Sequence, residues 1–492
     1  MARVTVTAAP LAIVHLLAVV DGAPVELSLD VRELIGDRRA LVDEALTSGA
    51  AVYGLTTQVG HGKDTRLSEE EIRGEQLFLV RSHSGGIGPP LPTAVVRAAL
   101  AVRVNGIARG GSGAGLPVAD TLAAMLNAGV HPLVPSTASV GAADIGQMAD
   151  IALVTIGIGR AEHRGEVMPG GEALRRAGIE PLVLSGKDGL ALISANGVSV
   201  GQAALVVRAA EQVAGGADLA AALSMEATRA NPSIVHPAVA AAKGIAGQAA
   251  AADHLRSLLA GSRLLEPDGP LSVQDALSFR VVPQVHGALR EYLQGARTAV
   301  EVELNAAEDN PLVWLPDRAL ISNGNFHPMV LAIAFDALRI ALAQVGQLSE
   351  RRMAHLWEAF FRQLARGASR RTVYGLQLRY PAAALFTELK QLAAPATLDV
   401  PPLDLGVEDH ATGAPLSVRK ADEAVNLLGD LLAVEMLLAH DVLATAATPV
   451  TLGSGTRAAL EMIEEVVGES EARPDAVHRS LRQRFPGPAC GG

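Results

Sequence analysis

Apolar residues recur at steps of three and four over two long stretches in the second half of the chain. One stretch holds Leu331, Phe335, Leu338, Leu342 and Val345, and the other holds Leu427, Leu431, Val434 and Leu438. This spacing predicts α-helices that carry their apolar side chains on one face. Because both faces are wide, we expect the two helices to be buried in a bundle or at a subunit interface.

The first 200 residues show shorter and more varied patterns. We expect a short strand pair that includes 25–29, helices at 31–48, 69–81 and 93–108, and Gly-rich loops at 53–63 and 83–92. Dense Gly and Pro between 157 and 192 indicate a small mixed α/β part. Helical spacing dominates beyond residue 201. We therefore predict a mainly α protein, with active-site loops in residues 1–200 and a long-helix bundle with C-terminal helices in 201–492, as one compact unit.

The composition supports close helix packing and argues against several partners. Hydrophobic residues make up 49% of the 492 positions but aromatic residues only 3%, so helices pack through small side chains. The net charge of -11 is spread over interspersed acidic and basic residues, which argues against binding to nucleic acid. The single cysteine, Cys490, excludes a disulfide framework and is typical of a reducing cytosol, so we expect a cytoplasmic protein.

The apolar start of the chain resembles a secretory signal. Pro10 and His15 interrupt it, and no small-residue cleavage site follows, so we expect no signal peptide. No uninterrupted apolar run reaches the roughly 20 residues of a membrane span, so we also expect no membrane contact.

General catalytic motifs give no function. Residues 110–115 are Gly-rich but do not follow a clear strand, and Gly62-Lys63 precedes Asp64 where a phosphate loop needs Ser or Thr. The 13 histidines show no metal-ligand spacing, so we expect no metal site. The stretch 134–153 has only small side chains before Ile145, which predicts a tight loop that feeds a helix capped by Asp144.

Many segments, in order, resemble the histidine and aromatic amino acid ammonia-lyase family. They are 53–57, 81–83 with 88–91, 134–153, 187–192, 274–280 with 283–285, 310–311, 325–327, 349–352 and 408–410. The resemblance implies the multihelical ammonia-lyase (aspartase/fumarase-like) fold. It also implies a homotetramer whose active sites combine loops of more than one subunit.

Members of this family carry an electrophile, methylidene-imidazolone (MIO), formed from Ala-Ser-Gly in the loop that resembles 134–153. The Gly nitrogen attacks the Ala carbonyl because Gly is unhindered, and the Ser side chain loses water to give the alkene. Here the loop reads Ala142-Ala143-Asp144 and is one residue shorter, and Ala-Ser-Gly occurs nowhere else in the chain. We therefore expect no MIO and no other cofactor.

Further departures fall on positions that lie near the electrophile in relatives. Ser194 stands where the family has Asn, Leu277 where it has Tyr, and Asp150 where it has His. The electrophilic half of the site is thus changed, whereas the half that meets the substrate is retained.

The resemblance assigns the retained groups their roles. Tyr53 is the acid/base, Arg280 clamps a carboxylate, and His83 with Glu408 can bind a basic ring or relay a proton. We expect the pocket to be lined by Asn325, Phe326 and Ser194. At pH 7 the phenolate of an ordinary tyrosine lies about 4 kcal/mol uphill, a gap that nearby positive charge narrows. We therefore expect Tyr53 and Arg280 in one pocket.

Each of these residues also has an ordinary structural interpretation. Tyr53 and His83 can be loop residues without a role, Arg280 an ion-pair partner, and Glu408 a solvated carboxylate. Asn325 and Phe326 can belong to the core, and Asp144 can be a new acid in place of the electrophile rather than a cap.

A positioned base alone supplies typically about 10²- to 10⁴-fold of rate, too little for an unactivated carbon acid. We expect Tyr-catalysed, MIO-independent chemistry on a preactivated small substrate that bears a carboxylate: β-elimination, conjugate addition or cyclisation, or isomerisation. One alternative is a non-catalytic or regulatory homologue in a mixed tetramer. Another is a conventional histidine or aromatic amino acid ammonia-lyase with an atypical electrophile.

Overall fold

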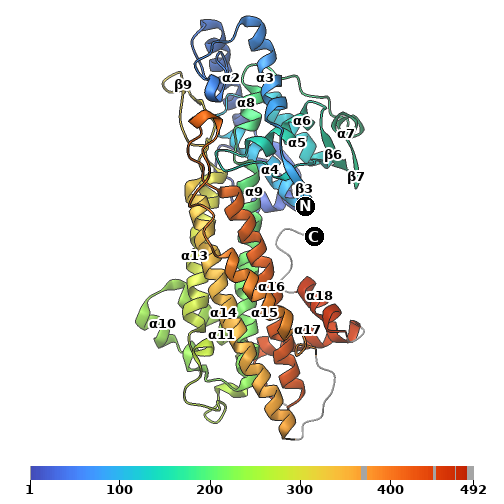
Figure 1. The fold of residues 1–492 in the computed structure, drawn as a ribbon, viewed down its shortest axis with the longest axis vertical. Coiled ribbons are helices and arrows are strands. Elements are labelled where there is room, and N and C mark those ends of the chain that lie inside the picture. The colour runs from blue at the N-terminus through green and yellow to red at the C-terminus, as the bar shows by residue number, and fades with distance from the viewer. Residues whose placement is uncertain (1, 367–373, 447–449, 471–472, 485–492) are drawn as a thin grey trace.

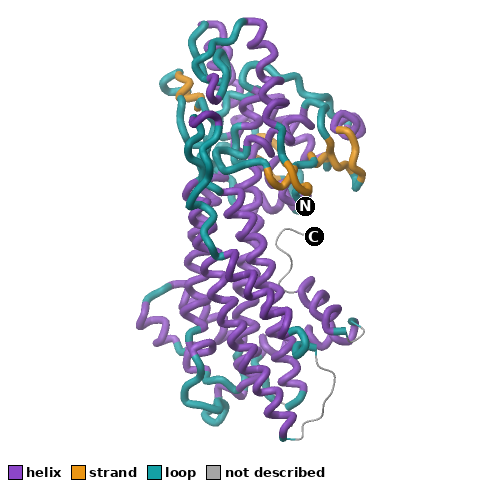
Figure 2. Tube along the Cα trace, in the orientation of Figure 1, coloured by secondary structure: helices purple, strands orange, loops and turns teal. Residues whose placement is uncertain are grey.

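The computed structural model describes residues 2–366, 374–446, 450–470 and 473–484. It is an elongated, mainly helical molecule in which long helices run from an N-terminal head to the opposite end (Figures 1 and 2). The long helices are α9 (Gly197–Thr228), α13 (Val282–Leu304), α14 (Met329–Ala365) and α16 (Ala414–Ala444), and the shorter α15 (Arg379–Leu392) packs beside α14 and α16. The prediction of a mainly α, multihelical protein is confirmed.

The two apolar repeats lie in α14 and α16, which pack against each other along the bundle. All five α14 residues of the repeat are completely buried, as are Leu431 and Leu438 of α16, with Val434 almost so. Leu427 is half-buried. The predicted burial of both helices is therefore confirmed.

Membrane crossing was not expected, yet two helical spans are long and apolar enough for it by composition. They are Asp188–Thr228 and Met329–Ala365, and their most apolar windows are 100% and 61% buried. Such burial is what core helices of a bundle show, and both spans pack against other helices of the bundle.

The head contains the short strands and the remaining N-terminal helices. Its helices are α1 (Ile13–Val20), α2 (Leu29–Ser48), α3 (Glu69–His83), α4 (Thr93–Ala108), α5 (Leu116–Ala128), α6 (Ile145–Thr155), α7 (Gly170–Ala177) and α8 (Asp188–Ile193), with the 3-10 turn η1 (Gly60–Gly62). Its strands are β1 (Val4–Val6), β2 (Val25–Leu27), β3 (Ile87–Pro90), β4 (Val130–Pro132), β5 (Pro135–Thr137), β6 (Arg160–His163) and β7 (Glu166–Pro169).

The strands form small separate sheets. β1 and β2 pair in parallel with Val4 opposite Val25, β3 pairs with β5, and β4, β6 and β7 form an antiparallel sheet. β6, β7, α7 and α8 make up the mixed α/β part predicted between 157 and 192. β8 (Leu312–Trp314) and β9 (Ala319–Ile321) form a hairpin after α13.

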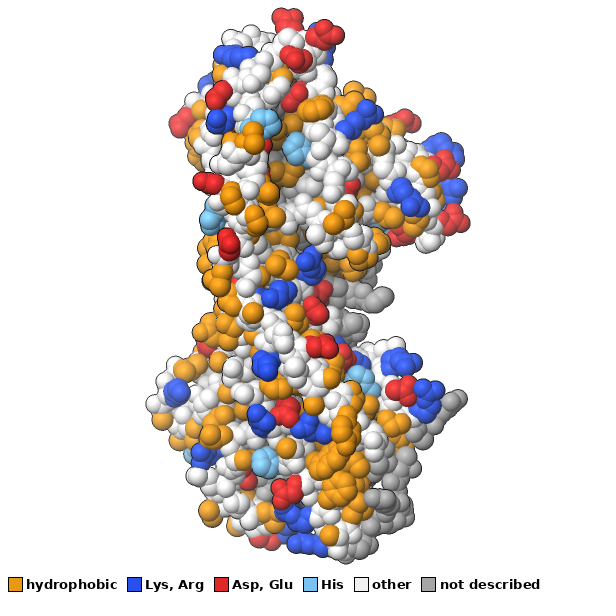
Figure 3. All heavy atoms as spheres, in the orientation of Figure 1, with side chains coloured by type: hydrophobic (Ala, Val, Ile, Leu, Met, Phe, Trp, Pro, Cys, Tyr) orange, Lys and Arg blue, Asp and Glu red, His pale blue; other side chains and the backbone are white. Residues whose placement is uncertain are grey.

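The far end of the bundle carries short helices. They are η2 (Pro232–Val235), α10 (Pro237–Lys243), α11 (Ala246–Leu258), η3 (Arg263–Leu265), α12 (Leu277–Arg280), α17 (Ser454–Glu469) and α18 (Pro474–Arg484). The turn η4 (Asp404–Gly406) lies between α15 and α16. On the face shown in Figure 3, acidic and basic side chains are interspersed among apolar ones.

Three sequence expectations need correction. Leu29 begins α2 rather than ending a strand, and Gly49 closes that helix in the left-handed conformation as expected. His83 is the last residue of α3 rather than a loop residue, and β3 occupies part of the expected loop 83–92. The apolar segment before residue 20 contains a helix, α1, whose Leu16 is completely buried.

Candidate active site

A cavity of about 560 Å³ lies where the N-terminal loops meet the segments that follow α13 and precede α16. It brings together most of the residues predicted from the family resemblance. Those that line it are Tyr53, His83, Ala142, Ala143, Ser194, Phe326 and Glu408. They come from the Tyr53 loop (residues 53–63), α3, the loop before α6, the end of α8 and two segments of the second half of the chain.

The Tyr53 loop is held rigidly at its start. The carbonyl of Val52 accepts the N–H groups of Leu55 and Thr56 at 3.1 and 3.0 Å, so the chain turns sharply at Tyr53. The phenolic oxygen of Tyr53 accepts the N–H of Gly60 at 3.0 Å. Burial raises the pKa of Tyr53; the Gly60 bond lowers it, and the carboxylates of Glu408 and Asp404 raise it further. Within one chain Tyr53 is therefore a protonated phenol at neutral pH.

His83 presents a defined tautomer. Its Nδ1 lies 2.8 Å from the carbonyl oxygen of Leu79, which can only accept, so Nδ1 carries the proton. When the ring is neutral, its Nε2 atom is a proton acceptor. Burial raises the pKa of the nearby Glu408, Asp404 raises it further, and His83 lowers it.

The loop before α6 is pinned by its backbone. The N–H of Ala143 donates to the carbonyl of Phe326 at 3.1 Å, and the carbonyl of Ala143 accepts the hydroxyl of Ser139 at 2.8 Å. The Thr412 hydroxyl donates to the carbonyl of Gly141 at 2.8 Å. Ala143 has a φ of 58°, a left-handed conformation that an alanine rarely adopts. These bonds hold Ala142 and Ala143 against the cavity.

Asp144 does not play the predicted part. It lies at the start of α6 but makes no side-chain cap there. Its buried carboxyl instead accepts the N–H and hydroxyl of Ser199, at 2.7 and 2.8 Å, in the first turn of α9. Burial raises the pKa of Asp144 to about 6, against its hydrogen bonds to Ser199 and Ser139. Asp144 joins two helix starts and does not line the cavity.

Arg280 lies far from Tyr53 in the same chain. It ends α12 and precedes α13, whereas Asn310 of the cavity follows the other end of α13. Those 23 helical residues span roughly 35 Å. The prediction that Tyr53 and Arg280 share a pocket is therefore wrong for a single chain. Within the part of the chain that the structure describes, the Arg280 guanidinium makes no hydrogen bond or ion pair.

Asn325 also stays outside the cavity. Its side chain is exposed and donates to the carbonyl of Ala307 at 3.3 Å, next to the cavity residue Phe326. The carboxyl of Asp150 accepts a hydrogen bond at 2.5 Å from the hydroxyl of Ser84, the residue that follows His83. Burial raises the pKa of Asp150.

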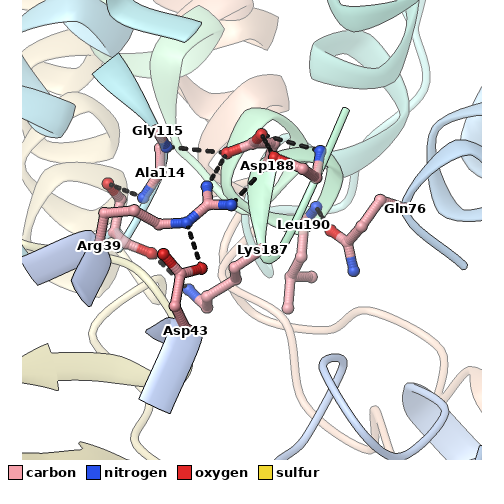
Figure 4. A network of polar contacts seen from close by, with 10 residues as sticks. Arg39, Asp43, Gln76, Ala114, Gly115, Lys187, Asp188 and Leu190 are labelled. Carbon is pink, nitrogen blue, oxygen red and sulfur yellow. Dashed lines mark hydrogen bonds and ion pairs between the residues drawn. The ribbon is translucent and has the colours of Figure 1, made fainter. Parts of the chain in front are cut away.

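A polar network behind the cavity positions α8 (Figure 4). The carboxylate of Asp188 accepts hydrogen bonds from the guanidinium of Arg39 at 2.9 Å and from the backbone N–H of Gly115 at 2.8 Å. Gln76 of α3 accepts the N–H of Leu190 at 3.0 Å and donates to the carbonyl of Gly54 at 3.2 Å. One buried amide thus links α3, α8 and the Tyr53 loop.

Several cavity residues carry no signal in the sequence. Glu75, His61, Phe78 and Asp404 all line the cavity, but each stands in an ordinary polar or helical context. Glu75, Asp404 and Glu408 give the lining three carboxylates, whereas none of the described lining residues is Lys or Arg. Burial raises the pKa of Glu75 as it does that of Glu408. Among the described residues, no group of three or more His, Cys, Asp or Glu side chains could hold a metal ion.

Comparisons with known proteins identify the family and agree with the fold. Residues 11–465 match the family described as aromatic amino acid lyase. Histidine ammonia-lyase of Alkaliphilus oremlandii is 37% identical over 452 residues, which cover 90% of this chain and 88% of the relative.

Solved structures show the same likeness. Histidine ammonia-lyase from Trypanosoma cruzi matches with a TM-score of 0.86 and 31% identity, over 98% of this chain and 93% of that one. Ergothionase, an ergothioneine-degrading enzyme from Treponema denticola in complex with desmethyl-ergothioneine sulfonic acid, matches with a TM-score of 0.91 and 27% identity, over 98% and 99%. This protein therefore belongs to the histidine and aromatic amino acid ammonia-lyase family, a family of lyase enzymes.

Proposed function

We propose that this protein eliminates an amine from a small carboxylate-bearing substrate without MIO, or catalyses the reverse addition. The observation that carries the proposal is the loop sequence Ala142-Ala143-Asp144. The methyl group of Ala143 has no hydroxyl to lose as water, so the alkene of MIO has no precursor. The residues present do not fit the group that relatives form at this position.

The substrate must therefore bring its own activation. The charges of the cavity favour a cationic group, because Glu75, Asp404 and Glu408 are acidic and none of the described lining residues is Lys or Arg. The rings of Phe78 and Phe326 offer faces that attract such a cation. A quaternary ammonium group satisfies both requirements. It is permanently cationic, and it is already activated because it leaves as a neutral tertiary amine.

The likeness to ergothionase supports this substrate class. That enzyme degrades ergothioneine, a betaine whose trimethylammonium group sits on the carbon next to the carboxylate. We propose that this chain acts on a betaine of that type, with a basic ring near His83 and Glu408.

A cationic substrate would also activate Tyr53. Its phenolate lies at least about 4 kcal/mol uphill at pH 7, and burial widens that gap. A positive charge about 5 Å away contributes roughly 3 kcal/mol at an effective dielectric constant of 20. In the proposed step the Tyr53 phenolate takes the β-proton and the C–H electrons form the double bond. The C–N bond breaks as the double bond forms, and its electron pair leaves with the amine.

The carboxylate clamp would come from a second subunit. Arg280 cannot reach the cavity of its own chain, and a planar guanidinium suits a carboxylate. α14 exposes Val330, Ile333 and Ile340 by 71%, 52% and 47%, at helical spacing along one face. We propose that this face packs against other subunits in a homotetramer, in the cytoplasmic setting that the composition predicts.

Two substrates with one product test the proposal. L-histidine and its trimethyl betaine both give the same unsaturated imidazole acid, so one absorbance assay follows both and only the leaving group differs. We expect product from the betaine and essentially none from histidine. We also expect Tyr53→Phe to lower kcat by about 10²- to 10⁴-fold. Undiminished turnover by that variant would remove Tyr53 from the mechanism.

A second candidate is ordinary ammonia elimination from histidine. The 37% identity to a histidine ammonia-lyase favours it. Faster turnover of histidine than of its betaine would establish this candidate, and no turnover of any betaine would favour the non-catalytic alternative.

A further inference from the structure

The turn that precedes Glu408 has an unusual backbone. Asp404 and Leu405 have φ values of 47° and 54°, so two consecutive residues other than glycine are left-handed. Leu403 and Glu408 close the turn with backbone hydrogen bonds at 2.8 and 3.3 Å. Asp404 and Glu408 therefore stand at the base of one turn, and both line the cavity.

The carboxylate of Asp404 reaches across to the Tyr53 loop. One oxygen accepts the backbone N–H of His61 at 2.8 Å, and the other lies 2.7 Å from Nδ1 of the same residue. The Asp404 side chain is 26% exposed and that of His61 is 65% exposed. The Asp404 turn is thereby joined to the Tyr53 loop by both the backbone and the side chain of His61.

The joined segment is the one that holds the phenol. Gly60 donates its N–H to the oxygen of Tyr53 at 3.0 Å and is followed directly by His61. Gly60 has a φ of 60°, and a Cβ at this position would overlap a carboxylate oxygen of Asp404. Glycine is therefore required both for the backbone conformation and for the close approach of Asp404.

We propose that Asp404 is a positioning residue for Tyr53, because it anchors the His61–Gly60 backbone that binds the phenolic oxygen and it places a negative charge beside that phenol. The inference rests on the proposed function only in taking Tyr53 as the acid/base. A fixed phenol at a set distance from Glu408 is what a directed proton transfer requires. Burial raises the pKa of Tyr53, and the charges of Glu408 and Asp404 raise it further, which strengthens the phenolate as a base once it forms.

The other ionisable groups around the cavity stay the same in the test. They are His61 of η1, Glu75 and His83 of α3, and Glu408 of the same turn. Asp404→Asn keeps an oxygen that accepts the His61 N–H, and asparagine tolerates a left-handed backbone, but the charge is gone. Asp404→Ala removes the anchor as well. Asp399→Asn, at an exposed position of the same segment, is the matched control.

Two measurements without substrate test the proposal. Hydrogen exchange should show peptides of residues 53–63 opening about tenfold faster or more in Asp404→Ala, because a hydrogen bond to a charged group is lost. Asp404→Asn and the control should match wild type. The four tyrosines, labelled as fluorotyrosine, give separable fluorine signals, and Tyr53→Phe identifies the signal of Tyr53.

The titration separates positioning from mere structural support. The Asp404 carboxylate raises the pKa of Tyr53. The midpoint of the Tyr53 titration should therefore fall to lower pH in Asp404→Asn and stay in place in the control. An unmoved midpoint in Asp404→Asn, or unchanged exchange in Asp404→Ala, would overturn the proposal. Neither result depends on turnover, so a failure to convert any betaine would refute the proposed function and leave this inference standing.

Discussion

Asp144 provides a stability prediction with a defined sign. Its carboxyl is completely buried, and burial raises its pKa from 3.8 to about 6. Between these values the folded state holds a proton that the unfolded state has released. The contribution of Asp144 to the free energy of unfolding is therefore fully present below about pH 4 and is lost as the pH rises through about 6. The difference between these two pKa values corresponds to roughly 3 kcal/mol in the free energy of unfolding.

The variant Asp144→Asn isolates this effect. Asparagine keeps an oxygen for the Ser199 N–H and offers an amide N–H to the Ser199 hydroxyl, so both hydrogen bonds of the carboxyl can persist. We expect the variant to match wild type near pH 4 and to exceed its stability by up to about 3 kcal/mol at pH 7. Urea unfolding across this pH range measures the difference.

The exposed Asp399→Asn serves as the control and should give a flat difference. A variant that is less stable than wild type at pH 7, or a difference that does not change with pH, would refute the reasoning. Either result would mean that the helix start at Ser199 stabilises the charged carboxylate more than burial penalises it.

Three further predictions concern the site and its support. Glu408→Gln should lower kcat/KM for a cationic substrate about tenfold or more. Burial raises the pKa of Glu408, which sets the acidic limb of the pH–rate profile, so this limb should disappear in the variant. Co-expressed Tyr53→Phe and Arg280→Ala chains should regain activity that neither has alone, whereas sites confined to one chain would stay inactive. Glu435→Ala leaves the buried Arg352 without its partner at 2.6 Å and should cost about 3–5 kcal/mol in urea unfolding; a smaller loss would show that water replaces the carboxylate.

Much of the fold is readable from local patterns. The helix predicted at 93–108 is α4 with the same bounds, and α3 begins where expected because Ser68 and Glu71 form a reciprocal cap. α1 escapes prediction because a segment of eight residues with a single polar position, His15, is too short to separate a helix from a strand by periodicity. Asp144 misleads because proximity in sequence favours a cap on α6, whereas tertiary packing turns its side chain to α9.

Some residues of the site can also be predicted from the sequence, and others cannot. Tyr53, His83 and Glu408 meet in one cavity, as their family positions indicate. Arg280 does not, because within one chain the 23 residues of α13 separate it from the cavity, a distance that the motif alone does not indicate. Asp404 is invisible in the sequence, since its role depends on a left-handed turn and on an approach to Gly60 that only coordinates reveal.

Catalysis without an electrophile is the central claim, and one measurement tests it most directly. Borohydride reduces an exposed electrophilic alkene such as that of MIO and does not alter tyrosine or carboxylate side chains. The initial rate of betaine elimination should be the same before and after borohydride treatment of the purified protein. A rate abolished by borohydride, and protected by substrate present during the treatment, would contradict the account.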